Sequence, residues 1–143
     1  MGAAGDAITR YTDREDGAEY LYTLFVPSDA SSAFPCFDQP DLKARFTLSV
    51  AAPPAWRVIG NAPIRESVAE GPNTRHRFAQ TEPISTYLFA FAAGPFVEIA
   101  ETGSASPVRL FARRARAARA QKEAAELLRL NRAAMLWLPL IHI

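Results

Sequence analysis

Two carboxylates and a thiol lie within six residues of one another in the sequence: Cys36, Asp38 and Asp41. Paired carboxylates can serve as general acid and base, and a cysteine can serve as a nucleophile when a histidine activates it. Pro35 and Pro40 fix their own backbone angles, which favours a turn in which the aspartates accept hydrogen bonds from nearby N–H groups. No histidine stands near Cys36, which favours a small buried hydrophobic residue. We therefore predict a structural role for this segment.

The two histidines, His76 and His142, lie far apart, and neither stands in a metal-ligand spacing. With a single cysteine the chain cannot form a thiolate zinc cluster or an internal disulfide. A glycine-rich phosphate loop and a Gly-x-Ser-x-Gly elbow are both absent from the sequence. These patterns predict no catalytic residue, no metal ligand and no cofactor in this chain.

A cluster of cations opens the last third of the sequence: Arg113, Arg114, Arg116, Arg119 and Lys122. Such a cluster can grip phosphates, but proteins that bind single-stranded nucleic acid also supply aromatic rings for stacking. None is interleaved here, so a solvated helix face with arginine stems lying over an apolar body is favoured. We predict no nucleic-acid partner.

Length and composition are those of one ordinary folded domain. The chain has 143 residues, of which 49% are hydrophobic and 22% charged. Residues 1–100 hold 8 basic against 12 acidic side chains, and residues 101–143 hold 8 against 3. The last third is therefore of a different character from the rest.

The longest apolar run, Tyr87–Val97, is too short to span a bilayer and contains Gly94-Pro95. Met1–Asp6 has neither the basic nor the apolar region of a signal peptide. We expect no membrane contact, and a single cysteine fits a reducing compartment, so we expect a cytoplasmic location.

Short, β-favouring segments bounded by glycine and proline predict a mainly β fold, an antiparallel sandwich or saddle followed by a C-terminal helix. In Ala44–Ala51 the alternation of Phe46, Leu48 and Val50 with polar residues predicts a half-buried strand. The other expected strands are Ala18–Pro27 with both faces covered, Trp56–Asn61, an edge-like Thr74–Gln80, a fully buried Ile84–Gly94, Phe96–Ala100 and Val108–Ala112. Polar and exposed segments are expected at residues 1–17 and 65–71, and a loop at residues 27–32.

From about Arg113 to Trp137 the sequence lacks glycine and proline and is rich in strong helix formers. Leu127, Leu130, Ala134 and Trp137 recur at three- and four-residue steps, which predicts an apolar stripe on this helix. We therefore divide the chain into a β domain at residues 1–112 and a lead-in helix with the start of another domain at residues 113–143. The apolar ending after Leu138 favours a segment cut from something larger.

Tyr20–Pro27 followed by Ala33–Ala44 resembles the N-terminal β domain of the M1 zinc aminopeptidases, the aminopeptidase N family. Trp56–Asn61 and Arg77–Gly94, with its Thr-x-Pro-x-Ser-x-Tyr-Leu run, agree with that family in order. The resemblance covers roughly residues 5 to 137. The structural signature that it assigns consists of Phe34, Pro35, Cys36, Asp38, Pro40 and Asp41.

The resemblance implies a saddle-like β domain that packs against a thermolysin-like catalytic domain, its expected partner, so that peptide substrate is met only indirectly. In the family that second domain holds zinc through His-Glu-x-x-His and a downstream glutamate, and uses a Gly-x-Met-Glu-Asn motif for the substrate's amino group. None of these motifs occurs in this sequence. Where many members carry Gln or Glu facing the substrate pocket, this chain has Leu24 and Val26, which allows an apolar pocket lining at most.

Two hypotheses follow from the sequence. The first is the non-catalytic N-terminal portion of an M1-type aminopeptidase, an enzyme that removes N-terminal amino acids from peptides, serving as scaffold and pocket wall. The second is a stand-alone β-rich module that binds a partner protein without peptidase activity.

Overall fold

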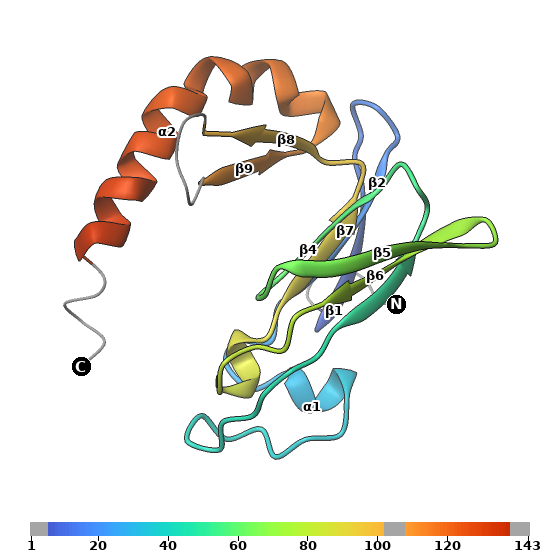
Figure 1. Ribbon diagram of the computed structural model, residues 1–143, viewed down its shortest axis with the longest axis vertical. Coiled ribbons are helices and arrows are strands. Elements are labelled where there is room, and N and C mark those ends of the chain that lie inside the picture. The colour runs from blue at the N-terminus through green and yellow to red at the C-terminus, as the bar shows by residue number, and fades with distance from the viewer. Residues whose placement is uncertain (1–5, 102–107, 138–143) are drawn as a thin grey trace. The chain divides into compact units, whose positions relative to one another are not determined.

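The computed structural model describes residues 6–101 and 108–137. By internal contacts the chain forms two compact units, Met1–Pro95 and Phe96–Ile143. Unit 1 contains seven of the nine strands found among the described residues, and unit 2 contains two strands and the long helix (Figure 1). The expectation of a mainly antiparallel β fold followed by a C-terminal helix is confirmed. The division at residues 112 and 113, drawn from composition and resemblance, stays a prediction about the family's domain boundary.

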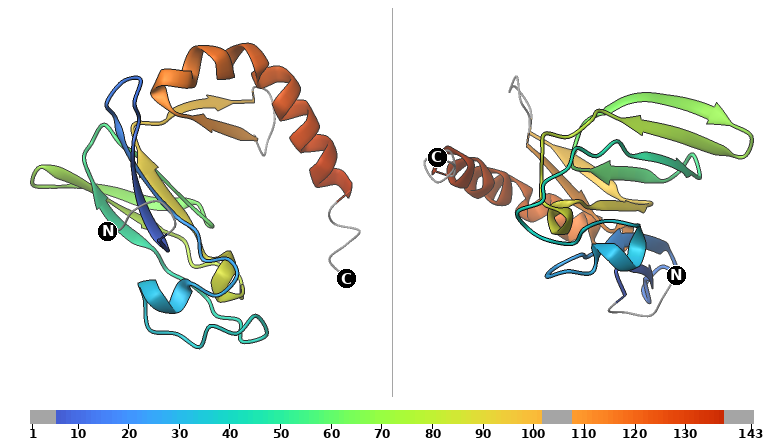
Figure 2. Two further views of the ribbon diagram at one scale, coloured as in Figure 1. Left: turned by 180° about the vertical axis from the view of Figure 1, so that it is seen from behind. Right: turned by 90° about the horizontal axis from the view of Figure 1, so that it is seen from below.

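Unit 1 is built from two antiparallel sheets (Figures 1 and 2). The four-stranded sheet has the order β1 (Ile8–Thr12), β2 (Glu19–Thr23), β7 (Phe91–Gly94) and β4 (Arg57–Gly60). The three-stranded sheet has the order β3 (Ser49–Ala52), β6 (Asn73–Phe78) and β5 (Ile64–Glu70). Two short helical segments complete the unit, α1 (Ala30–Ala33) and the 3-10 turn η1 (Thr86–Leu88).

The core of unit 1 lies between the two sheets. Ala52 and Phe78 come from the three-stranded sheet and Val58 and Ala93 from the four-stranded sheet, and all four are buried in one cluster. This is the packing of a β-sandwich, in which inward-facing side chains of both sheets meet. At the margin of the core, Gly94 lets β2 approach β7, since a Cβ there would lie 2.5 Å from a ring carbon of Tyr20.

Unit 2 is a hairpin covered by a helix. Strands β8 (Val97–Ala100) and β9 (Arg109–Ala112) pair antiparallel, and the 3-10 turn η2 (Arg114–Arg116) leads into α2 (Ala117–Trp137). Buried Ala124 and Leu128 of α2 pack on Ile99 of β8. The two strands and the helix agree with those expected from sequence.

The apolar stripe expected on α2 lies on an exposed face of the helix, and a different face packs on the hairpin. Leu127, Leu130 and Trp137 are 43%, 49% and 72% exposed, whereas Ala124 and Leu128 are buried. Ile99 of β8 forms one buried cluster with Ala124 and Leu128, so the packed face of the helix follows these two residues. The predicted stripe is a second, unpartnered face of the same helix among the described residues.

Three expectations about strands need correction. The expected edge strand at residues 74–80 is the central strand β6, because cross-strand ion pairs accommodate its polar residues: Arg75 with Glu70 at 2.6 Å and Arg77 with Glu66 at 3.1 Å. Residues 65–71 are exposed as expected, yet residues 64–70 form strand β5. Residues 8–12, taken as part of a polar lead-in, form β1, which pairs with β2 across a turn with Gly17 at φ +68°.

The segment Ile84–Gly94 is not one fully buried strand. Ile84 makes an isolated bridge to Ala44, the 3-10 turn η1 follows, and only the end of the segment joins the four-stranded sheet as β7. Its hydrophobic residues serve two different packing sites, which is why the run looks uniform in sequence.

Two further expectations are adjusted. The strand β2 ends at Thr23. Tyr22 and Leu24 are 40% and 57% exposed, so the face of this segment that carries them is not covered within the described chain. The loop expected at residues 27–32 contains the start of helix α1. In the segment 44–51 the predicted alternation is confirmed, since Phe46, Leu48 and Val50 are half-buried while their neighbours are exposed, although regular pairing as β3 begins only at Ser49.

Candidate functional site

The segment Phe34–Asp41 is anchored by a cluster of four phenylalanines: Phe25, Phe34, Phe46 and Phe89. Phe34 meets the other three rings edge-on at centroid distances of 5.8 to 6.0 Å. Phe46 and Phe89 stack at 4.5 Å. Edge-to-face and offset-stacked rings are the favoured aromatic geometries, so the first residue of the motif is fixed by packing.

Asp38 accepts hydrogen bonds from one residue that precedes it and one that follows it in the sequence. Its Oδ1 accepts a 2.6 Å hydrogen bond from the hydroxyl of Thr86, and its Oδ2 accepts a 3.2 Å bond from the backbone N–H of Ser31. The Thr86 hydroxyl first, and then the N–H groups of Ser31 and Ala30, hold the pKa of Asp38 below its usual value. Asp38 is therefore an ionised acceptor that joins η1 to α1. Its partners are distant residues rather than the neighbouring N–H groups of a local turn.

The motif and the residues that follow it, up to Phe46, are joined to residues 81–86 at three further points. The hydroxyl of Ser85 donates to the carbonyl of Pro40. Ala44 and Ile84 exchange backbone hydrogen bonds of 3.0 Å in both directions. Thr81 accepts from the N–H of Phe46 at 3.0 Å through its side chain. The two sequence blocks that carry the family resemblance therefore bind one another, and the roles of these later residues were not foreseen from sequence.

Cys36 is partly buried and its thiol is poorly suited to nucleophilic chemistry. Burial, reinforced by the negative charge of Asp38, raises the pKa of the Cys36 thiol above its usual value. A thiolate is the nucleophilic form, and this environment disfavours it. Asp41 is exposed, and its backbone carbonyl accepts a 3.1 Å hydrogen bond from the N–H of Lys43. The structure thus gives Asp38 and Asp41 different surroundings, and they do not act as a pair.

A groove of about 390 Å³ lies beside the motif, and we call it the motif groove. Nine residues line it: Phe34, Pro35, Cys36, Phe37, Leu42, Lys43, Ala44, Phe46 and Thr86. Seven of these nine side chains are apolar if the thiol is counted with them. The motif therefore builds a concave apolar surface as well as a turn.

Of the two histidines, His76 lies among the described residues. The Nδ1 atom of His76 lies 2.8 Å from the hydroxyl of Ser67, and its buried Nε2 has no hydrogen-bond partner. His142 lies outside the described residues. Among residues 6–101 and 108–137 no group of three or more His, Cys, Asp or Glu side chains could hold a metal ion.

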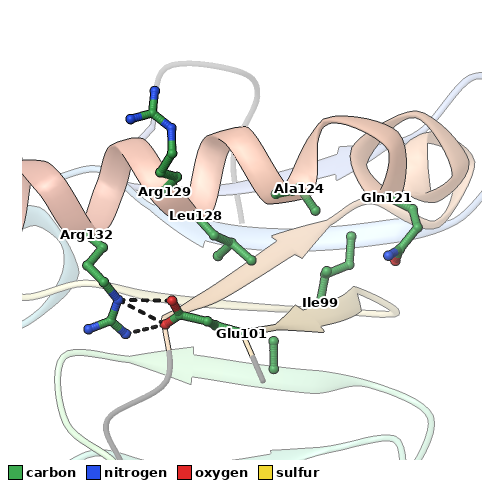
Figure 3. Close-up of a pocket in the computed structure, with 9 residues that line it drawn as sticks. Ile99, Glu101, Gln121, Ala124, Leu128, Arg129 and Arg132 are labelled. Atoms are coloured by element: carbon green, nitrogen blue, oxygen red, sulfur yellow. Dashed lines mark hydrogen bonds and ion pairs between the residues drawn. The ribbon is translucent and has the colours of Figure 1, made fainter. Parts of the chain in front are cut away.

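A second groove, of about 410 Å³, lies in unit 2 between β8 and α2 (Figure 3). Ile99, Ala124 and Leu128 line it, and at one end Arg132 forms a bidentate ion pair with Glu101. Arg129, at the rim, pairs with Glu126 at 2.7 Å. Both cations of this groove are therefore neutralised by carboxylates of the same unit.

The two positions for which the resemblance allows an apolar pocket lining at most are both open to solvent. Leu24 and Val26 follow strand β2 and are 57% and 53% exposed. The described part of the chain contains no helix that is long and apolar enough to span a membrane. The described residues thus define a β-rich domain whose most specific sequence motif builds structure.

Comparison with known proteins gives the family. The family model described as Peptidase M1 N-terminal domain matches residues 2–88. The chain therefore belongs to the M1 peptidase N-terminal domain family, as the resemblance predicted.

Individual relatives agree. The chain is 40% identical over 92 residues to aminopeptidase N of Streptomyces lividans, which covers 64% of this chain and 10% of that protein. It is 32% identical over 105 residues to human glutamyl aminopeptidase, covering 72% and 11%. It is 41% identical over 100 residues to a probable M1 family aminopeptidase of Encephalitozoon cuniculi, covering 68% and 12%. The chain thus matches about a tenth of the length of these relatives.

Proposed function

We propose that this chain is the non-catalytic N-terminal portion of an M1-type aminopeptidase, in which it serves as scaffold and as a wall of the substrate pocket. The observation that carries the proposal is the match to the M1 N-terminal domain over residues 2–88, whose two signature blocks bind one another in the fold. The chemistry of such an enzyme is removal of the N-terminal amino acid from a peptide. We assign this chemistry to a catalytic portion, which corresponds to the larger part of the relatives' length.

The structural features of unit 1 suit a scaffold. Its signature segment is fixed by ring packing and by the Asp38–Thr86 hydrogen bond, so it presents a rigid surface without titratable groups arranged for acid–base catalysis. In the proposed wall, Leu24 and Val26 would present apolar side chains to the substrate. Zinc, which the resemblance places in the catalytic portion of the family, would be held there, since the described residues offer no ligand set for it.

We also propose a cytoplasmic location for this portion, since a single free cysteine is compatible with a reducing compartment.

A hybrid enzyme tests the proposal. The matched residues of the Streptomyces lividans aminopeptidase N are replaced by those of this chain, and release of an amino acid from an aminoacyl anilide is measured. We expect the hybrid to fold and to remain active, and the 143-residue chain alone to release no amino acid. A soluble, cooperatively folded hybrid without activity would refute the scaffold role and favour a stand-alone binding module.

A further inference from the structure

The motif groove leaves large apolar side chains open to solvent. Phe37 is 81% exposed, the highest value among the exposed large hydrophobic residues of the described chain, and Leu42 is 45% exposed. Both line the groove together with Phe34 and Phe46, which belong to the phenylalanine cluster. An exposed aromatic residue beside an apolar groove is typical of a binding surface, because the anchor residues of interfaces are commonly aromatic and lie in such grooves.

The walls of the groove are fixed in advance. Phe34 and Phe46 lie 6.0 Å apart, with Phe46 stacked on Phe89. Thr86, a further lining residue, is 3% exposed and donates its hydroxyl to Asp38. A surface that is already ordered loses little conformational entropy when a partner binds, so a short segment can dock there.

Lys43 gives the groove a charge preference. It is the one charged residue among the nine that line the groove. Within the described residues no carboxylate forms an ion pair with its ammonium group. Lysine stems lie along apolar surface and leave the charge at the rim, where it selects for a partner of opposite sign.

We propose that the motif groove docks a segment of the catalytic portion of an M1 aminopeptidase, one that carries a large apolar side chain next to a carboxylate. The apolar side chain lies against Phe34 and Phe46 beneath the ring of Phe37, and the carboxylate pairs with Lys43. The inference rests on the proposed function. It takes the catalytic portion as the source because the relatives carry about nine tenths of their length outside the matched region. The second apolar face of α2 and the neutralised groove of unit 2 have no such charge preference.

The test uses overlapping short peptides that tile the whole Streptomyces lividans aminopeptidase N, probed with the labelled 143-residue chain. We expect binding to peptides from outside the matched region that place a Leu, Phe or Trp beside an Asp or Glu. Lys43→Glu and Phe37→Ser should each weaken that binding roughly tenfold or more. Lys122→Glu, the same charge change at an exposed position of α2, is the matched control and should leave binding unchanged.

Three outcomes overturn the inference: no peptide binds, the bound peptides lack a carboxylate, or Lys43→Glu binds the same peptides as tightly as the parent chain. A dimer of the parent chain that Phe37→Ser dissociates would also overturn it, because the occupant would then be a second copy. An active hybrid enzyme without peptide binding refutes the docking site and leaves the proposed function standing. A folded, inactive hybrid refutes the proposed function whatever the peptides do.

Discussion

Phe25→Ala tests whether the phenylalanine cluster holds the signature motif in place. Phe25 is 2% exposed and is the largest fully buried side chain among the described residues, with ring centroids 5.8 Å from Phe34 and 6.3 Å from Phe89. Replacing a buried phenylalanine by alanine costs about 3–5 kcal/mol, because the transfer free energy is lost and a cavity remains. For a unit of this size each kcal/mol lowers the unfolding midpoint by about 4–8 °C, so we expect a fall of at least roughly 12 °C.

The assay is thermal and urea unfolding of the 143-residue chain, followed by circular dichroism. Phe37→Ala is the matched control, since it removes the same side chain from an 81% exposed position three residues beyond Phe34 and should change the free energy of unfolding by no more than about 0.5 kcal/mol. Equal, small effects of the two substitutions would refute the assignment of the cluster as the anchor of the motif. A double-mutant cycle between Phe25 and Phe34 should give a coupling of about 0.5–1.5 kcal/mol beyond the area effect.

Three further predictions concern other parts of the fold. His76→Phe removes the buried Nε2 that has no partner together with the Nδ1 hydrogen bond to Ser67; because these two effects oppose each other, the free energy of unfolding should change by less than about 1 kcal/mol in urea titrations, and a larger loss would contradict this. Gly94→Ala places a Cβ 2.5 Å from the ring of Tyr20 and should destabilise unit 1 by about 1–3 kcal/mol, whereas an unchanged midpoint would show that the sheet yields easily. The Arg132 guanidinium lowers the pKa of Glu101, so the stability from this pair is present above the usual glutamate pKa and is lost as the pH falls through the lowered value. The measurement is the thermal unfolding midpoint as a function of pH. Glu101→Gln should make this midpoint fall less steeply at acidic pH, and an unchanged fall would exclude the ion pair as its cause.

The sequence predicted those features that depend on local pattern. The alternation of Phe46, Leu48 and Val50 with polar residues predicts that one face of the segment is buried, whatever covers it. This prediction is confirmed. The helix ending at Trp137 needs only strong helix formers, and it too is confirmed. Neither pattern depends on knowing which distant residues lie across from it.

The features that failed depend on such partners. The face of α2 that packs on the hairpin is set by its contact with Ile99, which the helical pattern alone does not reveal. The central position of β6 depends on carboxylates of the next strand, which satisfy its arginines. Asp38 and Thr86 are 48 residues apart, and no local rule connects them. The resemblance placed both blocks in one family without giving their contact.

The activity of the hybrid enzyme tests the central claim most directly. With the matched residues of the Streptomyces lividans aminopeptidase N replaced by those of this chain, we predict a kcat/KM for an aminoacyl anilide within about tenfold of the parent enzyme. In the same assay the 143-residue chain alone should give no turnover. Turnover by the chain alone, or a folded hybrid without turnover, would contradict the account.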